Sequence, residues 1–149
     1  METITELFHR YRDDVYRLAV SYTKSPEEAE DVCQTVFLKL LEQGSVTLGK
    51  EKAWLMQVTA NQCRSLLRSS WWKKTTALDE SISVGPPQTN EVLRAVMDLD
   101  PKYRVVVYLH YYEGYSTGEI GKLLKISPSA VTTRLSRARK RLKETLKEV

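Results

Sequence analysis

Several residue types on which enzymes depend are scarce in this 149-residue chain. It has only two cysteines, Cys33 and Cys63, without a CxxC spacing, and only two histidines, His9 and His110. Neither histidine has a cysteine or carboxylate at a spacing typical of a metal site or a catalytic pair. No glycine-rich loop is present that could cradle a phosphate. We therefore expect no enzymatic activity, no cofactor and no metal site, and we interpret the cysteines as reduced thiols.

Long apolar runs are missing as well. No segment approaches the roughly 18 apolar residues of a membrane span, and the N-terminal segment METITELFHRYRDD is charged where a signal peptide would be apolar. No segment sustains a polar-apolar alternation, and no tandem repeat occurs. The sequence thus predicts an all-α, cytoplasmic protein that does not insert into membranes by itself.

Turn-forming residues divide the chain once. The stretch from Lys73 to Asn90 gathers hydroxyl residues, Gly85 and two adjacent prolines without a helical period, which is typical of a flexible linker. Apolar periodicity predicts helices on both sides of it, although residues 105–108 have strand propensity. The predicted helices span about residues 4–22, 26–43, 51–70, 91–99 and 101–113, followed by a closely linked pair. We therefore predict two small helical domains, 1–72 and 91–149, joined by the linker 73–90.

The stretch from Tyr115 to Leu142, YSTGEIGKLLKISPSAVTTRLSRARKRL, has the pattern of a DNA-binding helix-turn-helix. Ser116 and Glu119 fit a capping box at the start of one helix, and Ser127 before a proline fits the start of the next. In the second helix, an apolar stripe opposes small hydroxyl residues followed by cations, an order that suits base edges and then phosphates. The stripe is Val131, Leu135, Ala138 and Leu142, and the opposite side is Ser129, Thr133, Ser136, Arg137 and Lys140. An ordinary amphipathic hairpin with a solvated basic side is the alternative.

Charge is distributed unevenly along the chain. Residues 1–42 contain five Lys and Arg against nine Asp and Glu, whereas residues 127–149 contain seven against two. The basic C-terminal segment favours salt-sensitive binding to DNA phosphates. The acidic N-terminal third would repel DNA and indicates a different partner there, most naturally a protein.

The predicted helix at 26–43 carries a leucine on its polar side. Its apolar residues and those of the preceding helix recur at spacings of three and four, which indicates a shared core. The inward residues are Ile4, Leu7, Phe8, Tyr11, Val15, Leu18 and Tyr22, then Ala29, Val32, Cys33, Val36, Phe37 and Leu40. The outer arc carries Asp31, Gln34, Thr35, Leu38 and Glu42. A single exposed leucine is common, but Leu38 within an acidic stripe could also anchor a partner helix, and the residues leave both interpretations open.

The predicted helix at 51–70 has two chemically different sides. One side carries Leu55, Val58, Thr59 and Leu66, and the other carries Gln57, Asn61, Arg64 and Arg68, with Trp54 at its edge. These polar and aromatic groups can offset phosphate charge, pair with a base edge and stack on an extruded base, so they suit single-stranded nucleic acid. A solvated polar face with Trp54 partly buried explains the same spacing. Trp71 and Trp72, which precede two lysines, are equally ambiguous.

Three blocks, in this order, make the chain resemble the bacterial RNA polymerase sigma factors of the sigma-70 family, in its extracytoplasmic-function (ECF) group. The segment EEAEDVCQTVFLKLL, residues 27–41, resembles the polymerase-binding helix of region 2, and AWLMQVTANQCRSLLR, residues 53–68, resembles its promoter-melting helix. The segment from Leu99 to Arg141, with DPKYR and then the helix-turn-helix, resembles region 4. With the first helix and the linker, these blocks span nearly the whole chain.

The resemblance implies a sigma factor that binds core RNA polymerase and directs transcription initiation at particular promoters. The region 2-like domain would recognise and melt the −10 element, and the helix-turn-helix would read the −35 element. The residues implied are Asp31, Gln34, Thr35 and Leu38 for core polymerase; Trp54, Gln57, Asn61, Arg64 and Arg68 for single-stranded −10 DNA; and Ser129, Thr132, Thr133, Ser136, Arg137 and Lys140 for −35 DNA. Arg139 would serve phosphates or packing. An anti-sigma factor is a further implied partner, besides core RNA polymerase and promoter DNA.

The chain departs from the family pattern at Thr132, where members usually carry a basic residue. The hydroxyl there puts one phosphate or guanine contact in doubt. Another class also stays open on the residues alone: a stand-alone repressor or activator could use the same helix-turn-helix, with the N-terminal helices serving dimerisation or ligand sensing. Such a protein would bind palindromic duplex DNA tightly without polymerase.

Overall fold

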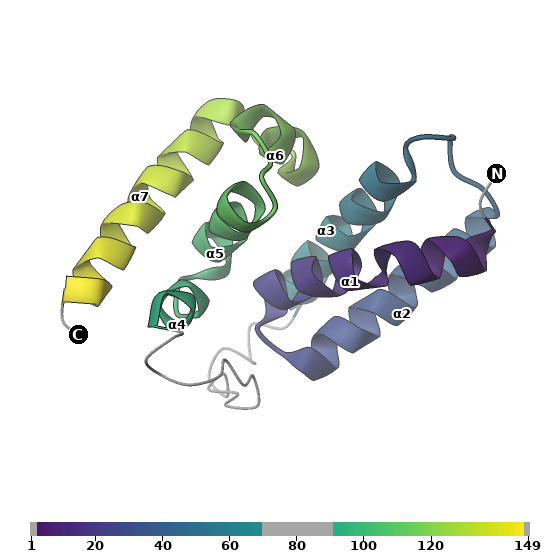
Figure 1. The fold of residues 1–149 in the computed structure, drawn as a ribbon, viewed down its shortest axis with the longest axis horizontal. Helices are drawn as coiled ribbons and strands as arrows, with labels where there is room; N and C mark the ends of the chain where they lie inside the picture. The colour runs from purple at the N-terminus through teal and green to yellow at the C-terminus, as the bar shows by residue number, and fades with distance from the viewer. Residues whose placement is uncertain (1–2, 70–90, 148–149) are drawn as a thin grey trace. The chain divides into compact units, whose positions relative to one another are not determined.

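The computed structural model describes residues 3–69 and 91–147, and both ranges are built from helices (Figure 1). They belong to two compact units, called here the N-terminal unit (residues 3–69) and the C-terminal unit (residues 91–147). Neither range contains a strand, which confirms the predicted all-α fold. The predicted linker, 73–90, lies outside the described residues, as do Trp71 and Trp72.

The N-terminal unit contains three helices, α1 (Ile4–Thr23), α2 (Pro26–Gln43) and α3 (Glu51–Ser69). The Thr3 hydroxyl oxygen accepts a hydrogen bond from the backbone N–H of Glu6 at 3.2 Å and caps α1. Ser25 caps α2 in the same way, because its hydroxyl oxygen accepts from the N–H of Glu28 at 3.2 Å. The Ser25 cap explains why α2 begins at the predicted residue. Gly44, the C-cap with φ 84°, explains why α2 ends at the predicted Gln43.

The core of the N-terminal unit lies among the three helices, with α1 in contact with both α2 and α3. All six predicted inward residues of α2 are buried, but the prediction for the other two helices was less accurate. In α1, Ile4, Phe8 and Tyr11 are only half-buried. In α3, Val58 and Leu66 are half-buried, and the core side is Leu55, Met56, Thr59, Ala60 and Cys63. The side of α3 that faces the core is thus centred on Met56 and Cys63, not on Leu66.

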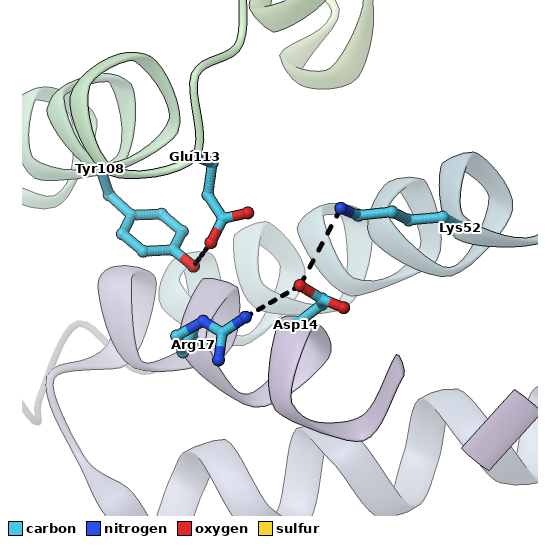
Figure 2. Close-up of polar contacts among 5 residues, drawn as sticks. All are labelled: Asp14, Arg17, Lys52, Tyr108 and Glu113. Atoms are coloured by element: carbon cyan, nitrogen blue, oxygen red, sulfur yellow. Dashed lines mark hydrogen bonds and ion pairs between the residues drawn. The ribbon is translucent and has the colours of Figure 1, made fainter. Parts of the chain in front are cut away.

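Polar contacts join α3 to the other two helices of its unit. One oxygen of Asp14 on α1 accepts a hydrogen bond from Arg17 at 2.9 Å and lies 3.9 Å from the Lys52 ammonium at the start of α3 (Figure 2). On the other side, the Lys39 ammonium of α2 donates to the Gln62 side-chain oxygen at 3.1 Å. Exposed contacts of this kind contribute little stability, about 0 to 1 kcal/mol each, so the position of α3 depends mainly on its buried residues.

The C-terminal unit contains α4 (Glu91–Met97), α5 (Pro101–Val107), the π-helix η2 (Tyr108–Tyr112), α6 (Thr117–Leu124) and α7 (Pro128–Lys147). Helix α4 ends two residues before the predicted boundary. The buried Arg104 side chain donates to the carbonyl oxygens of Met97, the last residue of α4, at 3.2 Å and of Leu99, just after the helix, at 2.7 Å. Carbonyl groups at a helix end lack partners within the helix, and Arg104 supplies them. Burial lowers the pKa of Arg104 to about 10, so the guanidinium still carries its charge at neutral pH.

Helix α5 continues into a wider turn. Three consecutive valines, residues 105–107, are buried in α5 in spite of their strand propensity, because they face the core. The backbone N–H of Glu113 then donates to the carbonyl oxygen of Tyr108, five residues earlier, at 3.1 Å. The Tyr108 hydroxyl also donates to the Glu113 carboxylate at 2.7 Å (Figure 2). The predicted helix at 101–113 is therefore present, but its second half is a π-helix.

Candidate nucleic-acid and partner interfaces

Helices α6 and α7 form the helix-turn-helix, and the predicted capping box is present at its start. The Ser116 hydroxyl oxygen accepts from the backbone N–H of Glu119 at 3.1 Å, while the Glu119 carboxylate accepts from the N–H of Ser116 at 2.9 Å. That second bond stabilises the charged carboxylate and lowers the pKa of Glu119. The Nδ1 atom of His110 lies 2.9 Å from the Tyr115 carbonyl oxygen, just before this cap. Since a carbonyl only accepts, Nδ1 is the donor, and His110 has a structural role.

The turn between α6 and α7 depends on a close backbone contact at Gly121. A β-carbon at Gly121 would lie 2.7 Å from the carbonyl oxygen of Ile126 and 3.4 Å from the nitrogen of Pro128. Lys125, the C-cap of α6, has a left-handed conformation (φ 60°) that reverses the chain within this short turn. The start of α7 is then fixed by the Ser127 hydroxyl oxygen, which accepts from the N–H of Ala130 at 3.1 Å. These contacts position the first turn of α7.

The six residues predicted to read −35 DNA are all exposed on α7 and are called the recognition face below. The recognition face comprises Ser129, Thr132, Thr133, Ser136, Arg137 and Lys140. On the opposite side Val131, Leu135 and Ala138 are buried, and Leu142 is half-buried. Hydroxyl groups thus occupy the N-terminal turns of the face, and cations follow them.

Two neighbouring side chains of α7 make contacts within the unit. The Thr132 hydroxyl donates to the carbonyl oxygen of Pro128 at 3.1 Å, one turn earlier in the helix. Arg139 donates to the Tyr111 hydroxyl of η2 at 2.9 Å. Of the two roles implied for Arg139, phosphate binding and packing, this bond favours packing. The Pro128 carbonyl therefore already uses the hydroxyl donor of Thr132, the position at which the sequence departs from the expected family pattern.

The predicted polar side of α3 carries a hydrogen-bonded group of three side chains, called the amide cluster below. The Asn61 side-chain oxygen, Oδ1, accepts from Nε2 of Gln57 at 3.2 Å and from the guanidinium of Arg64 at 2.6 Å. All three side chains are half-buried, as is Trp54 at the edge of this side, whereas Arg68 is exposed. The structure therefore joins three of the five predicted −10 residues by hydrogen bonds, with Trp54 about one turn before them on α3 and Arg68 one turn after them.

The outer face of α2 carries two exposed leucines, and sequence reasoning identified only one of them. The predicted residues Asp31, Gln34 and Leu38 are exposed, and Thr35 is half-buried. Leu38 and Leu41 are both 57% exposed. The spacing of three residues places Leu41 beside Leu38 and could have revealed it. An apolar pair rimmed by acidic and amide groups is a stronger sign of a protein-binding surface than a lone leucine.

The remaining chemistry-bearing residues are structural. Cys33 and Cys63 are unpaired and buried, and burial raises the pKa of their thiols to about 11 and about 12. His9 is exposed and makes an edge contact with the Phe8 ring. Within residues 3–69 and 91–147, no cluster of His, Cys, Asp and Glu could hold a metal ion. No helix in the same ranges has the length and apolar character to cross a bilayer.

Comparison with known proteins assigns both units. Residues 7–73 match the family described as Sigma-70 region 2, and residues 89–142 match the family described as Sigma-70, region 4. The ECF RNA polymerase sigma factor SigM of Bacillus subtilis (strain 168) is 33% identical over 153 residues, which cover 95% of this chain and 93% of SigM. The RNA polymerase sigma factor CarQ of Myxococcus xanthus is 31% identical over 159 residues, covering 99% of this chain and 91% of CarQ.

Two solved structures share the fold. The sigma factor RpoE, in complex with the anti-sigma factor NepR from Bartonella quintana, superposes with a TM-score of 0.73 and 23% identity, covering 94% of each chain. CnrH, in complex with the cytosolic domain of CnrY, superposes with a TM-score of 0.66 and 23% identity, covering 97% of this chain and 88% of CnrH. At 23% identity, these two structures are evidence for a shared fold only.

A helix-turn-helix with an exposed hydroxyl-and-cation face is typical of DNA-binding proteins. The matches to both sigma regions, and to relatives over more than nine tenths of their length, identify a narrower class of protein. The chain belongs to the ECF sigma factors of the sigma-70 family, which are non-enzymatic factors for promoter-specific transcription initiation.

Proposed function

We propose that this chain joins core RNA polymerase, holds the −10 element as single-stranded DNA with its N-terminal domain and reads the −35 element with its C-terminal domain. The domains in this proposal are residues 1–72 and 91–149, with 73–90 as the connection between them. The observation that carries the proposal is that each unit presents its own nucleic-acid chemistry. The recognition face of α7 suits a duplex groove, and the amide cluster of α3 suits exposed bases.

At the −35 element, α7 enters the major groove with its N-terminal turns first. Thr133 and Ser136 lie toward the start of the recognition face and contact base edges, while Arg137 and Lys140 follow and contact bases or phosphates. On the opposite side of α7 the buried Val131, Leu135 and Ala138 pack the helix against the rest of the C-terminal unit. The close contact at Gly121 holds the start of α7 at one angle to α6.

At the −10 element, α3 holds the non-template strand after the duplex opens. Asn61 contacts an extruded base, Trp54 provides an aromatic surface beside it, and Arg64 and Arg68 attract the phosphates. Extruding a base from a duplex costs a few kcal/mol. This chain performs no covalent chemistry, so it promotes opening only by binding the open strand more tightly than the duplex.

Core polymerase binds the outer face of α2. Asp31, Gln34 and Thr35 supply polar contacts around Leu38 and its neighbour Leu41, and these leucines lose their exposed apolar surface on binding. The acidic balance of residues 1–42 matches a basic partner surface and keeps this face away from DNA. Because promoters and polymerase occupy the bacterial cytoplasm, the chain acts there.

An anti-sigma protein would control this activity by covering one or both binding surfaces. RpoE and CnrH, which share the fold, were each solved in complex with another protein, and for RpoE that protein is an anti-sigma factor. The apolar pair on α2 and the recognition face of α7 are the surfaces whose occlusion would stop the proposed function.

The decisive experiment combines the purified chain with bacterial core polymerase on a library of promoter fragments. We expect transcripts that start at discrete positions and that core polymerase alone does not make. A stand-alone repressor would behave differently, since it would bind palindromic duplexes tightly without polymerase. Tight duplex binding without any association with core polymerase would contradict the proposal.

A further inference from the structure

We propose that Asn61 recognises the extruded −10 base as a hydrogen-bond donor only, and that Gln57 and Arg64 are positioning residues that hold its amide in this orientation. The inference rests on the proposed function, because it takes single-stranded −10 DNA as the ligand of α3. It adds the chemical preference of the contact, namely a base edge that offers acceptors.

The orientation of the Asn61 amide follows from its arginine partner. A guanidinium group donates hydrogen bonds and accepts none. The amide atom that lies 2.6 Å from the Arg64 nitrogen must therefore be the oxygen Oδ1 and not the nitrogen. The same reasoning assigns the Gln57 amide, because only its nitrogen Nε2 can donate to that oxygen, at 3.2 Å.

Both acceptor positions of the Asn61 amide are thereby occupied. An amide oxygen has two lone pairs, and Oδ1 of Asn61 already accepts two hydrogen bonds. None of the described residues accepts a hydrogen bond from the Asn61 nitrogen, Nδ2, and the side chain is half-buried at the surface. Two N–H groups thus remain for a ligand, and no acceptor does.

This polarity restricts which base Asn61 can recognise. Asparagine commonly recognises adenine with both halves of its amide, one donating and one accepting. Asn61 lacks the accepting half while Gln57 and Arg64 occupy it. Adenine is therefore disfavoured at the contacted position. A base edge with neighbouring acceptors, such as N7 and O6 of guanine or N3 and O2 of cytosine, fits the two N–H groups.

The test uses full-length holoenzyme on a promoter that it opens, with all four bases placed in turn at each non-template position of the −10 element. The contacted position is the one at which the Asn61→Ala variant loses the preference among the four bases that the wild type shows. At that position, wild-type holoenzyme should open the adenine promoter about tenfold less than the best promoter, the size expected for one good side-chain to base contact. The Gln57→Leu/Arg64→Met double variant releases Oδ1 and should reduce this difference to about threefold or less.

Two control variants separate positioning from general stabilisation. Arg64→Lys retains a donor for Oδ1 and should keep the wild-type base preference. Gln62→Leu removes another amide of α3, one that accepts from Lys39 and not from the amide cluster, and it should also leave the preference unchanged. Gln57→Leu alone releases one lone pair and provides the test if the double variant does not fold.

The outcomes distinguish this inference from the proposed function. A double variant that opens every promoter less well in equal proportion would overturn the inference, as would an Asn61→Ala profile that matches wild type. In both cases the wild-type holoenzyme would still initiate at its promoter. A wild-type chain that gives core polymerase no promoter at all would instead defeat the proposed function.

Discussion

The absence of a β-carbon at Gly121 allows the backbone of the helix-turn-helix to make its close turn. Gly121→Ala would place a β-carbon 2.7 Å from the Ile126 carbonyl oxygen, and the backbone of the turn would have to move. We expect the C-terminal unit to lose about 1 to 3 kcal/mol of its free energy of unfolding, as measured by chemical denaturation.

Gly118 in the same helix is the matched control. A β-carbon there meets only the Ser116 hydroxyl, at an ordinary contact distance of 3.9 Å. Gly118→Ala should therefore leave the stability unchanged or raise it by up to about 1 kcal/mol through helix propensity. Similar losses for the two substitutions would show that the close contact is not what requires glycine at position 121.

The charge on Glu119 makes the start of α6 sensitive to acid. The hydrogen bonds from Ser116 lower the pKa of the folded carboxyl below its value of 4.5 in the unfolded chain. Its contribution to stability is therefore complete above about pH 4.5 and is lost as the pH falls through the folded-state value. We expect Glu119→Gln, which keeps the acceptor oxygen without the charge, to reduce the fall in melting temperature between pH 6 and pH 3. A fall equal to that of the wild type would contradict this role of the carboxylate.

At the scale of elements, the recognition face predicts different effects for its two ends. Thr133→Ala should weaken binding to promoters that carry one particular −35 base pair by about 1 to 3 kcal/mol, because the proposed base contact would be lost. Lys140→Ala should weaken binding to every sequence alike and reduce the salt slope by about 1 if, of the two contacts proposed above, Lys140 makes the one to a phosphate. Titration of holoenzyme on −35 variants at several salt concentrations measures both effects. Identical behaviour of the two variants would refute this division.

The helices could largely be predicted from the sequence, because their limits are set by local chemistry. The caps at Ser25, Ser116 and Ser127 act on backbone groups three residues away, so the starts of α2, α6 and α7 follow from the sequence. The π-helix could not be predicted in this way. It depends on contacts such as the bond from the Tyr115 N–H to the Leu109 carbonyl oxygen, which the apolar pattern does not specify.

The candidate sites were predicted as faces, and their internal contacts were not. The spacing of Gln57, Asn61 and Arg64 placed them on one side of α3, but the direction of each amide follows only from which atoms meet. The prediction placed Leu66 on the inner side of α3, whereas the core side contains smaller residues such as Ala60. Small residues contribute little to an apolar pattern although they pack in the core.

At the scale of the whole molecule, the outer face of α2 should decide whether the chain joins polymerase. Leu38→Asp or Leu41→Asp would place a charge in the apolar pair, and we expect association with core polymerase to weaken by about tenfold or more, the effect of about 1.4 kcal/mol or more in binding free energy. The control is Leu48→Asp, because Leu48 is 74% exposed but lies in the segment between α2 and α3. Equal weakening by all three substitutions, measured by fluorescence anisotropy with labelled chain, would show that α2 is not the polymerase-binding surface.

The burial of Cys33 and Cys63 affects how these two residues react with oxidants. A thiolate, and not a neutral thiol, is the nucleophile that attacks peroxides and disulfide reagents. Both cysteine side chains remain protonated inside the N-terminal unit at physiological pH, because burial raises their pKa. The folded chain is therefore a poor direct sensor of oxidants through these two residues. An oxidative signal that acts on cysteine thiols would therefore act on a binding partner and change the association of that partner with this chain.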